Sequence, residues 1–257
     1  MPVYESIPFG KPCWVDFVSS DLAKVRPFYQ AIFGWEFQEL GSDFGNYNII
    51  SGQHGPVGGG MQHNAEMMGP DSDKWDMYFS VEDAQSTLDA ATAAGGEQTV
   101  PPMPIGDQGS MAFCNDVNGS AVGIWQPGTL MGFAAWGEPG YPAWFELHTR
   151  NFEKSVGFYE DVLPVKASPS EMPDGMKYAT LDVDGDQSAG VWDITGVLPE
   201  ETPVEWTIWF SVSDCDASCA KAKELGGEVV MEPEDTEHGR VATIADPTGS
   251  TFNIISG

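Results

Sequence analysis

Two acidic residues occupy equivalent positions among aromatic residues in a phrase that occurs twice. Asp16 lies in "CWVDFVSSDLAKVRPFYQAIFGW" and Glu146 in "AWFELHTRNFEKSVGFYEDVLPV", each two residues after a tryptophan. Desolvation among rings raises the pKa of a carboxyl group, which suits a general base acting on a weakly acidic C–H group. The same arrangement binds a cationic ligand, because a Trp ring attracts a cation by roughly 0.5–2 kcal/mol. A third interpretation makes each carboxylate a structural hydrogen-bond acceptor.

The repeated phrase belongs to a tandem duplication of the whole chain. Trp14 matches Trp144, and the pair Phe28-Tyr29 matches Phe158-Tyr159. A second segment, "WDMYFSVEDAQSTLDAATAAGGE", is similar to "WTIWFSVSDCDASCAKAKELGGE" in the other half. Repeats of this length indicate duplicated structural units. We therefore expect one domain at 1–126 and another at 141–257, with a linker at 127–140.

Each half divides again into two modules, at about 10–65 and 73–126 in the first half and about 141–195 and 203–257 in the second. Every module begins with an alternating strand, continues with a helical pattern and ends in short β-like segments separated by turn residues. Expected helix N-caps are Ser20 or Asp21 for the first helix, and Asp83, Asn151 and Asp214 for the others. Pro27 predicts a kink or a late start in the first helix. The fold class is α+β, with four βαβββ modules paired into two domains.

Alternation along the first and last strands separates an apolar face from a mixed face. The apolar face carries residues such as Val15, Phe17, Ile208 and Phe210, and the helices are expected to pack against it. Four Trp side chains on the other face argue against simple solvation and favour a sheet curled around a ligand cavity. The predicted ligand-binding residues on this mixed face are Trp14, Asp76, Tyr78, Trp125, Trp144, His148, Trp209 and Asn253, with Asp16 and Glu146 as candidate catalytic residues.

Several motifs resemble those of the vicinal oxygen chelate superfamily. They are the "D-L-x-K-x-x-x-F-Y" helix entry at Asp21 to Tyr29 followed by "FGW", the "V-x-D" strand exits ending at Asp83 and Asp214, and "D-P-T-G-S" from Asp246. That superfamily includes glyoxalase I, bleomycin-resistance proteins, fosfomycin-resistance enzymes and extradiol dioxygenases. The chain looks most similar to its tandem two-domain, actinobacterial glyoxalase-like subgroup. The resemblance implies two glyoxalase-like domains, each a cupped mixed sheet with its helices outside.

Metalloenzymes of this superfamily place His, Gln or Glu ligands on the opening and closing strands of paired modules. By that pattern the first half presents Trp14, Asp76 and Gly123, and the second half presents Trp144, Thr207 and Asn253. Neither trio is a set of divalent-metal ligands. We therefore expect no cofactor, and keep a divalent metal as a weaker alternative. Substitute ligand sets would be Asp16, Asp76 and His63 in the first half, or Glu146, His148 and Asp193 in the second.

Composition limits the classes of partner. The net charge is −28, from 39 acidic and 11 basic residues, which disfavours nucleic acid and anionic membrane surfaces and is compatible with a cationic ligand. No apolar run reaches the length of a membrane span, and no secretory leader is evident, so we expect a cytoplasmic protein. Four separated cysteines predict free thiols. Whether the chain forms a homodimer stays open.

The first functional hypothesis is a metal-free protein that holds a small organic molecule, aromatic or cationic, in an aromatic and acidic cavity. The alternative is a glyoxalase-like lyase, or a dioxygenase-related or other metal-dependent enzyme of the superfamily. A third hypothesis, in which the duplicated domains only scaffold a partner, also stays open. Fold does not decide between these hypotheses.

Overall fold

The computed structural model describes residues 6–68, 73–171 and 175–257. The first half contains β1 (Pro12–Ser19), α1 (Leu22–Phe33), β2 (Glu36–Glu39), the 3-10 turn η1 (Ser42–Phe44), β3 (Asn48–Gly52), β4 (Gly55–Gln62), α2 (Ala65–Met68), β5 (Lys74–Ser80), α3 (Ala84–Ala93), β6 (Glu97–Ile105), β7 (Gly109–Asn115) and β8 (Ala121–Pro127). Its strands form one eight-stranded sheet in the order β2-β3-β4-β1-β5-β8-β7-β6.

The second half repeats this arrangement. It contains β9 (Pro142–Thr149), α4 (Phe152–Val162), β10 (Lys166–Glu171), β11 (Lys177–Val183), β12 (Asp186–Asp193), β13 (Trp206–Ser211), α5 (Cys215–Glu224), β14 (Glu228–Thr236), β15 (Gly239–Ala245) and β16 (Thr251–Ser256). The second sheet has the order β10-β11-β12-β9-β13-β16-β15-β14. The predicted α+β class, with four βαβββ modules in two domains, is confirmed.

The long helices begin where their capping residues predict. The carboxylates of Asp21, Asp83 and Asp214 accept hydrogen bonds from the backbone N–H groups three residues further on. Asn151 precedes α4 but makes no capping bond through its side chain. The helix α1 begins directly after Asp21 and contains Pro27, so the predicted late start does not occur.

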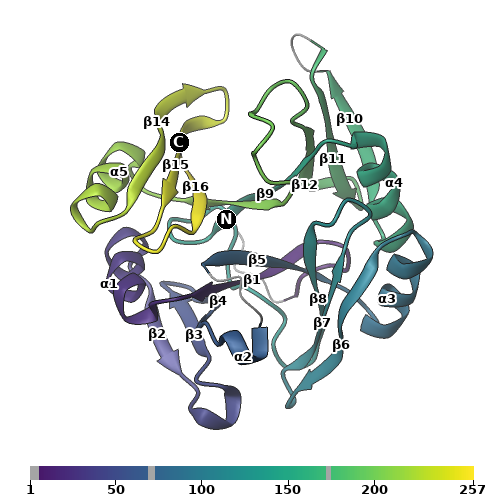
Figure 1. Cartoon of the computed structure of the whole chain (residues 1–257), viewed down its shortest axis with the longest axis horizontal. Coiled ribbons are helices and arrows are strands. Elements are labelled where there is room, and N and C mark those ends of the chain that lie inside the picture. Colours follow the sequence, from purple (N-terminus) through teal and green to yellow (C-terminus); the bar gives the residue numbers. More distant parts are fainter. Residues whose placement is uncertain (1–5, 69–72, 172–174) are drawn as a thin grey trace.

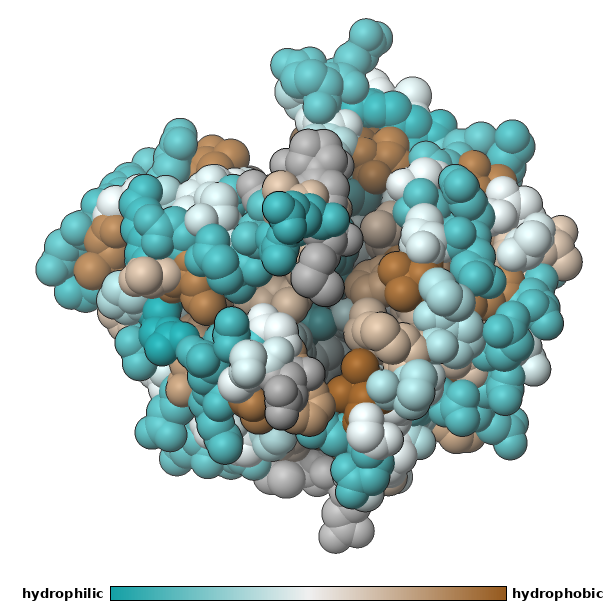
Figure 2. Space-filling view, turned by 60° about the horizontal axis from the view of Figure 1, so that its bottom comes forward, coloured by the Kyte–Doolittle hydropathy of each residue, from teal (hydrophilic) through white to brown (hydrophobic). Residues whose placement is uncertain are grey.

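Modules pair within each half. The opening strands β1 and β5 run antiparallel at the centre of the first sheet, with Asp16 opposite Asp76, and β9 and β13 do the same in the second, with Glu146 opposite Thr207. Figure 1 shows the outer strands of each sheet rising on either side of these central pairs, so that each sheet is curled into a cup. The two cups open in opposite directions. Figure 2 brings the side of the first domain forward and shows a hollow with apolar residues along one edge.

The domains meet through the apolar faces of their sheets, back to back. Trp75 of the first sheet lies 5.2 Å from Phe210 of the second, and Phe79 lies 5.4 Å from Trp206, measured between ring centroids. The helices flank this contact in mixed pairs, α1 beside α5 and α3 beside α4 (Figure 1). Helices of different domains therefore complete a shared core.

The repeated Phe-Tyr pair carries much of the contact between domains. Tyr29 donates a hydrogen bond of 2.7 Å to Asp246, and the equivalent Tyr159 donates one of 3.3 Å to Asp116. The neighbouring Phe28 ring approaches Gly227 so closely that a Cβ there would lie 2.7 Å away. Phe158 meets Gly96 in the same way, at 2.8 Å. These motifs hold the domains together.

The segment between the sheets is packed rather than loose. The backbone N–H of Phe133 donates to Cys13 and that of Ala134 donates to Pro56. Phe133 and Tyr141 are buried. All four cysteines are free thiols, as predicted. In the part of the chain that the structure describes, no helix is long and apolar enough to cross a membrane.

Candidate functional site: the two cups

The concave face of the first sheet carries a closed hydrogen-bond network around Asp16. The Trp14 indole N–H donates to one Asp16 oxygen at 3.0 Å, and the Tyr47 hydroxyl donates to the same oxygen. The Tyr78 hydroxyl donates to the other oxygen at 2.7 Å. Three donors therefore converge on one carboxylate, and Trp14 and Tyr78 are almost completely buried.

Burial and charge act in opposite ways on this network. Desolvation raises the pKa of Asp16, and the hydrogen bonds from Tyr47, Tyr78 and Trp14 oppose that rise. Burial and the negative charge of Asp16 raise the pKa values of Tyr47 and Tyr78 well above the usual tyrosine value, so both hydroxyls keep their protons and donate. Desolvation also raises the pKa of Asp76, against the effect of Lys74, whose ammonium lies 3.1 Å away.

Glycines make room for the tyrosine rings. A Cβ at Gly59 would lie 1.7 Å from the Tyr47 hydroxyl, and a Cβ at Gly123 would lie 2.3 Å from the Tyr78 ring. Gly59 pairs with Asp16 across the parallel strands β4 and β1. The glycine-rich segment "GPVGGGM" therefore serves close packing of side chains over the sheet.

The second cup keeps the tryptophan and the carboxylate but surrounds them differently. The Trp144 indole donates to the Tyr178 hydroxyl at 3.0 Å, and Tyr178 lies over Gly190 as Tyr47 lies over Gly59. Burial and the charge of Glu146 raise the pKa of Tyr178. Glu146 is 8% exposed and faces His148, with 3.2 Å between Oε1 and Nε2. The His148 ring meets the Trp192 ring edge to face, 5.2 Å away.

Neither cup presents a full set of metal ligands at the positions that metalloenzymes of the superfamily use. In the first cup a tryptophan and a tyrosine-covered glycine flank Asp76, and the nearby Asp16 already accepts three hydrogen bonds. In the second cup the trio is Trp144, Thr207 and Asn253, of which Asn253 accepts a hydrogen bond from Thr243 at 2.7 Å. One carboxylate paired with Lys74 in the first cup, and one amide with one hydroxyl in the second, do not form a divalent-metal site, so these residues do not fit the metal.

The substitute ligand sets are not assembled either. Among the described residues, no three His, Cys, Asp or Glu side chains lie together as a metal site. His63 follows β4, where its backbone N–H donates to Ser19, and Asp193 caps its own turn by accepting from the Thr195 N–H. The structure brings together Asp16 with Asp76 and Glu146 with His148, without a third ligand.

Two further predicted residues, Trp125 and Trp209, lie on strands β8 and β13 beside these networks. In the first cup, Trp125 donates to the Leu130 carbonyl at 2.9 Å. In the second, Trp209 pairs in register with both Trp144 and Asn253. The additional residues on these faces are Tyr47, Tyr178, Thr180 and Trp192. Tyr47 and Tyr178 are themselves a repeated pair, at an offset of 131, and the internal alignment could have found them.

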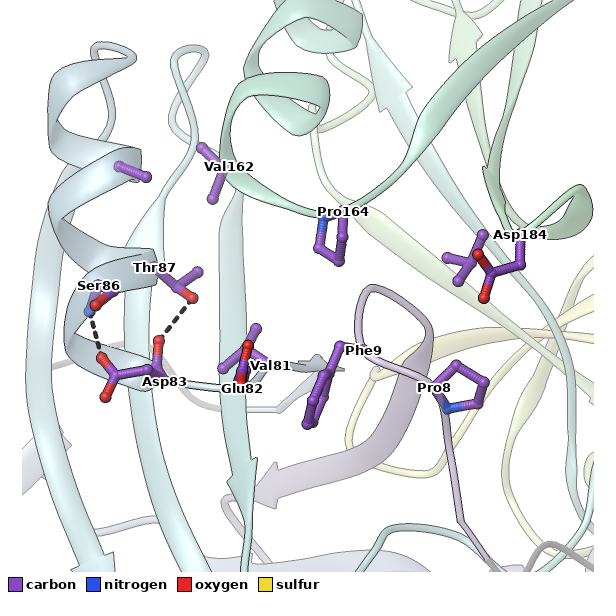
Figure 3. A pocket seen from close by; sticks show the side chains of 12 residues that line it. Pro8, Phe9, Val81, Glu82, Asp83, Ser86, Thr87, Val162, Pro164 and Asp184 are labelled. Carbon is purple, nitrogen blue, oxygen red and sulfur yellow. Dashed lines mark hydrogen bonds between the residues drawn. The ribbon is translucent and has the colours of Figure 1, made fainter.

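A separate pocket lies in the seam between the domains. It has a volume of about 570 Å³ and is lined by apolar residues such as Pro8, Phe9 and Pro164 together with Glu82 and Asp184 (Figure 3). The carboxylate of Asp83, also at its edge, is engaged as the cap of α3. None of the predicted site residues lines this pocket.

The fold and the two cups define a class: a duplicated protein of paired βαβββ modules, each pair enclosing one concave sheet face. A family model described as "Glyoxalase/Bleomycin resistance protein/Dioxygenase superfamily" matches residues 13–124 and again residues 142–254. The chain belongs to this superfamily and carries two copies of its domain.

Similar proteins are known by sequence and by structure. A putative glyoxylase, CFP32, of Mycobacterium tuberculosis is 31% identical, over 99% of this chain and 98% of its own. The anthracycline biosynthesis protein DnrV of Streptomyces peucetius is 32% identical, over 96% and 93%. Among solved structures, the Mn(II)-bound glyoxalase from Novosphingobium aromaticivorans has a TM-score of 0.65 at 17% identity, covering 96% of this chain and 82% of its own. The 2,3-dioxygenase LapB from Pseudomonas sp. KL28 also gives 0.65, at 14% identity over 96% and 92%. These structural likenesses concern the fold.

Proposed function

We propose that this protein binds a small organic molecule on a concave sheet face without the divalent metal used by enzymes of its superfamily. One observation carries the proposal: five of the six positions that would hold the metal carry tryptophan, threonine, asparagine or a glycine covered by a ring, and Asp76 alone is a residue type that binds divalent metals well. Aromatic walls with a few fixed polar groups are typical of ligand sites.

The similarity to DnrV, named as an anthracycline biosynthesis protein, supports an aromatic ligand of several fused rings. A net charge of −28 further favours a ligand that carries an amine. The proposed ligand is therefore a polycyclic aromatic molecule, with positive charge as an added advantage.

The test combines metal analysis with ligand binding. Protein without a metal-binding tag is analysed by inductively coupled plasma mass spectrometry, and melted with and without Mn²⁺, Fe²⁺, Ni²⁺ and Zn²⁺. The same protein is titrated with an aminoalkyl-substituted 1,4-dihydroxyanthraquinone. We expect no stoichiometric metal and saturable binding of the anthraquinone. A ligand at a hundred times its Kd stabilises the folded protein by about 2.7 kcal/mol, which a melt detects. Stoichiometric metal with a raised melting temperature would refute the metal-free proposal.

A lyase or another enzyme of the superfamily is the second candidate, and the contact between Glu146 and His148 favours it. The Glu146 and His148 side chains are 3.2 Å apart. The carboxylate can therefore take a proton from a substrate C–H group while the imidazole holds the carboxylate in position. Asp16 is the equivalent residue of the first cup, but its oxygens are already engaged by three donors. Loss of turnover in Glu146→Gln with binding retained would favour the enzyme, whereas weakened binding alone would favour the binding protein.

A further inference from the structure

Several buried polar atoms without partners lie on one face of the second sheet. The described part of the chain has seven buried side-chain nitrogen or oxygen atoms that lack a hydrogen bond. Four of them belong to strands β11, β12 and β13 of the second sheet: Thr180 Oγ1, Asp182 Oδ1, Trp192 Nε1 and Trp209 Nε1. Leaving such an atom unpaired costs about 1–3 kcal/mol, so a concentration of them calls for an explanation.

The strand register places these residues around Glu146 and His148. Thr180 pairs with Gly190, which pairs with Glu146, and Trp192 pairs with His148. Trp209 pairs with Trp144, four residues before His148 on β9. The two unpartnered indoles therefore lie on the same concave face, on either side of β9 and about 13 Å apart along it. The 96% burial of Thr180 adds an unpartnered hydroxyl to this face.

The first cup differs at the equivalent positions. Tyr78 stands where the second cup has Trp209, and its hydroxyl is bonded to Asp16. The indole N–H of Trp14 donates to Asp16 and Tyr47, and that of Trp125 donates to a backbone carbonyl. The polar atoms of these three rings are thus satisfied within the protein. In the second cup the Trp144 indole donates to Tyr178, whereas the indoles of Trp192 and Trp209 lack a partner.

The chemistry of the unpartnered atoms selects the ligand. An indole N–H is a donor only, so its missing partner is an acceptor oxygen such as a carbonyl, a phenol or an ether. The backbone positions of Trp192 and Trp209 are offset by about 13 Å along the strand, so each donor is expected to meet its own acceptor oxygen on an extended ring system. Rings on the same face, from Trp144 and Tyr178, offer surfaces on which such a ligand can stack.

We infer that the second cup is the ligand site, and that Trp192 and Trp209 select an oxygenated polycyclic ligand by donating hydrogen bonds to its acceptor oxygens. This inference rests on the proposed function and deepens it. The first cup, whose polar groups satisfy one another, is then a structural copy that supports the shared core.

The experiment follows the indole N–H signals of the full-length protein by ¹H–¹⁵N correlation spectroscopy. The chain has nine tryptophans, and single Trp→Phe variants assign the signals of Trp192, Trp209, Trp14 and Trp125. The probe is the aminoalkyl-substituted 1,4-dihydroxyanthraquinone. Its matched control is an anthracene with the same aminoalkyl chain and no ring oxygens. We expect the oxygenated probe to shift the signals of Trp192 and Trp209 and to leave those of Trp14 and Trp125 in place.

Affinities measured by calorimetry complete the test. Trp192→Phe and Trp209→Phe keep a ring but remove the donor, so each should weaken binding of the oxygenated probe about five- to tenfold. These two variants should bind the anthracene control as tightly as the parent does. The control variant Trp136→Phe, in the segment between the domains, should bind both compounds as tightly as the parent does. Thermal melts confirm that each variant is folded.

The outcomes separate this inference from the proposed function. Saturable binding that shifts Trp14 and Trp125 instead, or that is indifferent to both Phe variants, overturns the assignment to the second cup and leaves the binding function standing. If neither compound binds saturably, both this inference and the proposed function are overturned.

Discussion

At the scale of single residues, the glycines of the cup faces show how closely each aromatic side chain is packed. Gly59 and Gly190 lie on the parallel strands beside Asp16 and Glu146, and each is covered by a tyrosine hydroxyl, from Tyr47 at 1.7 Å and from Tyr178 at 2.0 Å of a would-be Cβ. No real Cβ fits at such distances. The tyrosines therefore hold their place over the carboxylates only because these positions have no side chain.

Gly59→Ala should destabilise the protein by about 1–3 kcal/mol, because the new methyl group displaces the Tyr47 hydroxyl from Asp16. The matched control is Gly157, which lies within α4 with open space around its Cβ position. Gly157→Ala should stabilise by about 0.5–1 kcal/mol, since alanine is the better helix former. Urea unfolding of the three proteins measures both values. A Gly59→Ala variant as stable as the parent would contradict this close packing of Tyr47 over Gly59.

The pKa of Asp16 predicts a pH dependence of stability. Because burial raises this pKa in the folded protein, the folded state holds the proton more tightly than the unfolded chain does. The contribution of Asp16 to stability is therefore greatest at low pH. It falls as pH rises from the ordinary carboxyl pKa towards the raised value, and is then constant.

The measurement is the difference in unfolding free energy between parent and Asp16→Asn from pH 3 to pH 7. Carboxylates that do not interact with Asp16 cancel in this difference, whereas Asp76, whose negative charge raises the pKa of Asp16, does not. We expect this difference to decrease with rising pH at the acid end of the range. A difference that increases there would show that the folded pKa is depressed instead.

At the scale of the elements, α1 lies in the first domain and α4 in the second, and both helices pack at the interface between the domains. The Tyr29 hydroxyl donates to Asp246 and accepts from the Trp75 indole at 3.2 Å. Tyr159 repeats this with Asp116 and with Trp206, at 2.8 Å. Asp246 also accepts backbone hydrogen bonds from the turn before β16. Each tyrosine thus ties a helix of one domain to a turn of the other.

Tyr29→Phe and Tyr159→Phe should each reduce stability by about 1–3 kcal/mol, because a buried carboxylate loses a donor. The loss should be larger for Tyr29, whose bond to Asp246 is 2.7 Å, than for Tyr159, whose bond to Asp116 is 3.3 Å. Chemical unfolding gives both values, and ligand affinity should not change in either variant because both residues lie away from the cups. Equal and negligible losses would show that the interface does not depend on these bonds.

At the scale of the whole molecule, two cups placed back to back share one apolar core. Rings from both halves, including Phe33, Trp75, Phe210 and Phe252, contact one another between the sheets. Separating the halves would expose these rings to water, at a cost of about 25 cal/mol per Å² of apolar surface. The domains are therefore expected to unfold together.

The two halves expressed separately, as residues 1–127 and 141–257, should not form stable monomers, while the full chain should show one cooperative transition. Circular dichroism melts and ¹H–¹⁵N spectra of each half measure this directly. A dispersed spectrum and a cooperative melt from either half alone would show that its own core is sufficient. Mixing the halves serves as a control, since a complex that regains both features would locate the missing stability in the interface.

Much of the architecture could be predicted because it is written in local patterns. The duplication, the four modules, the strand faces and the caps at Asp21, Asp83 and Asp214 follow from periodicity and capping chemistry, which depend on neighbours in sequence. The resemblance to the superfamily also identified the metal-ligand positions in the sequence, and among them only Asp76 is a residue type that binds divalent metals well.

What the tertiary structure decided is which groups satisfy one another. The sequence presented Trp14 and Asp16, and Trp144 and Glu146, as the same motif twice. Only the packing shows that Tyr47 and Tyr78 close the first network, while Trp192 and Trp209 remain unpartnered in the second. The role of the Phe-Tyr pairs was also out of reach, since their partners lie 217 and 43 residues away. Hydrogen-bond satisfaction depends on contacts between distant strands, and no local pattern encodes those contacts.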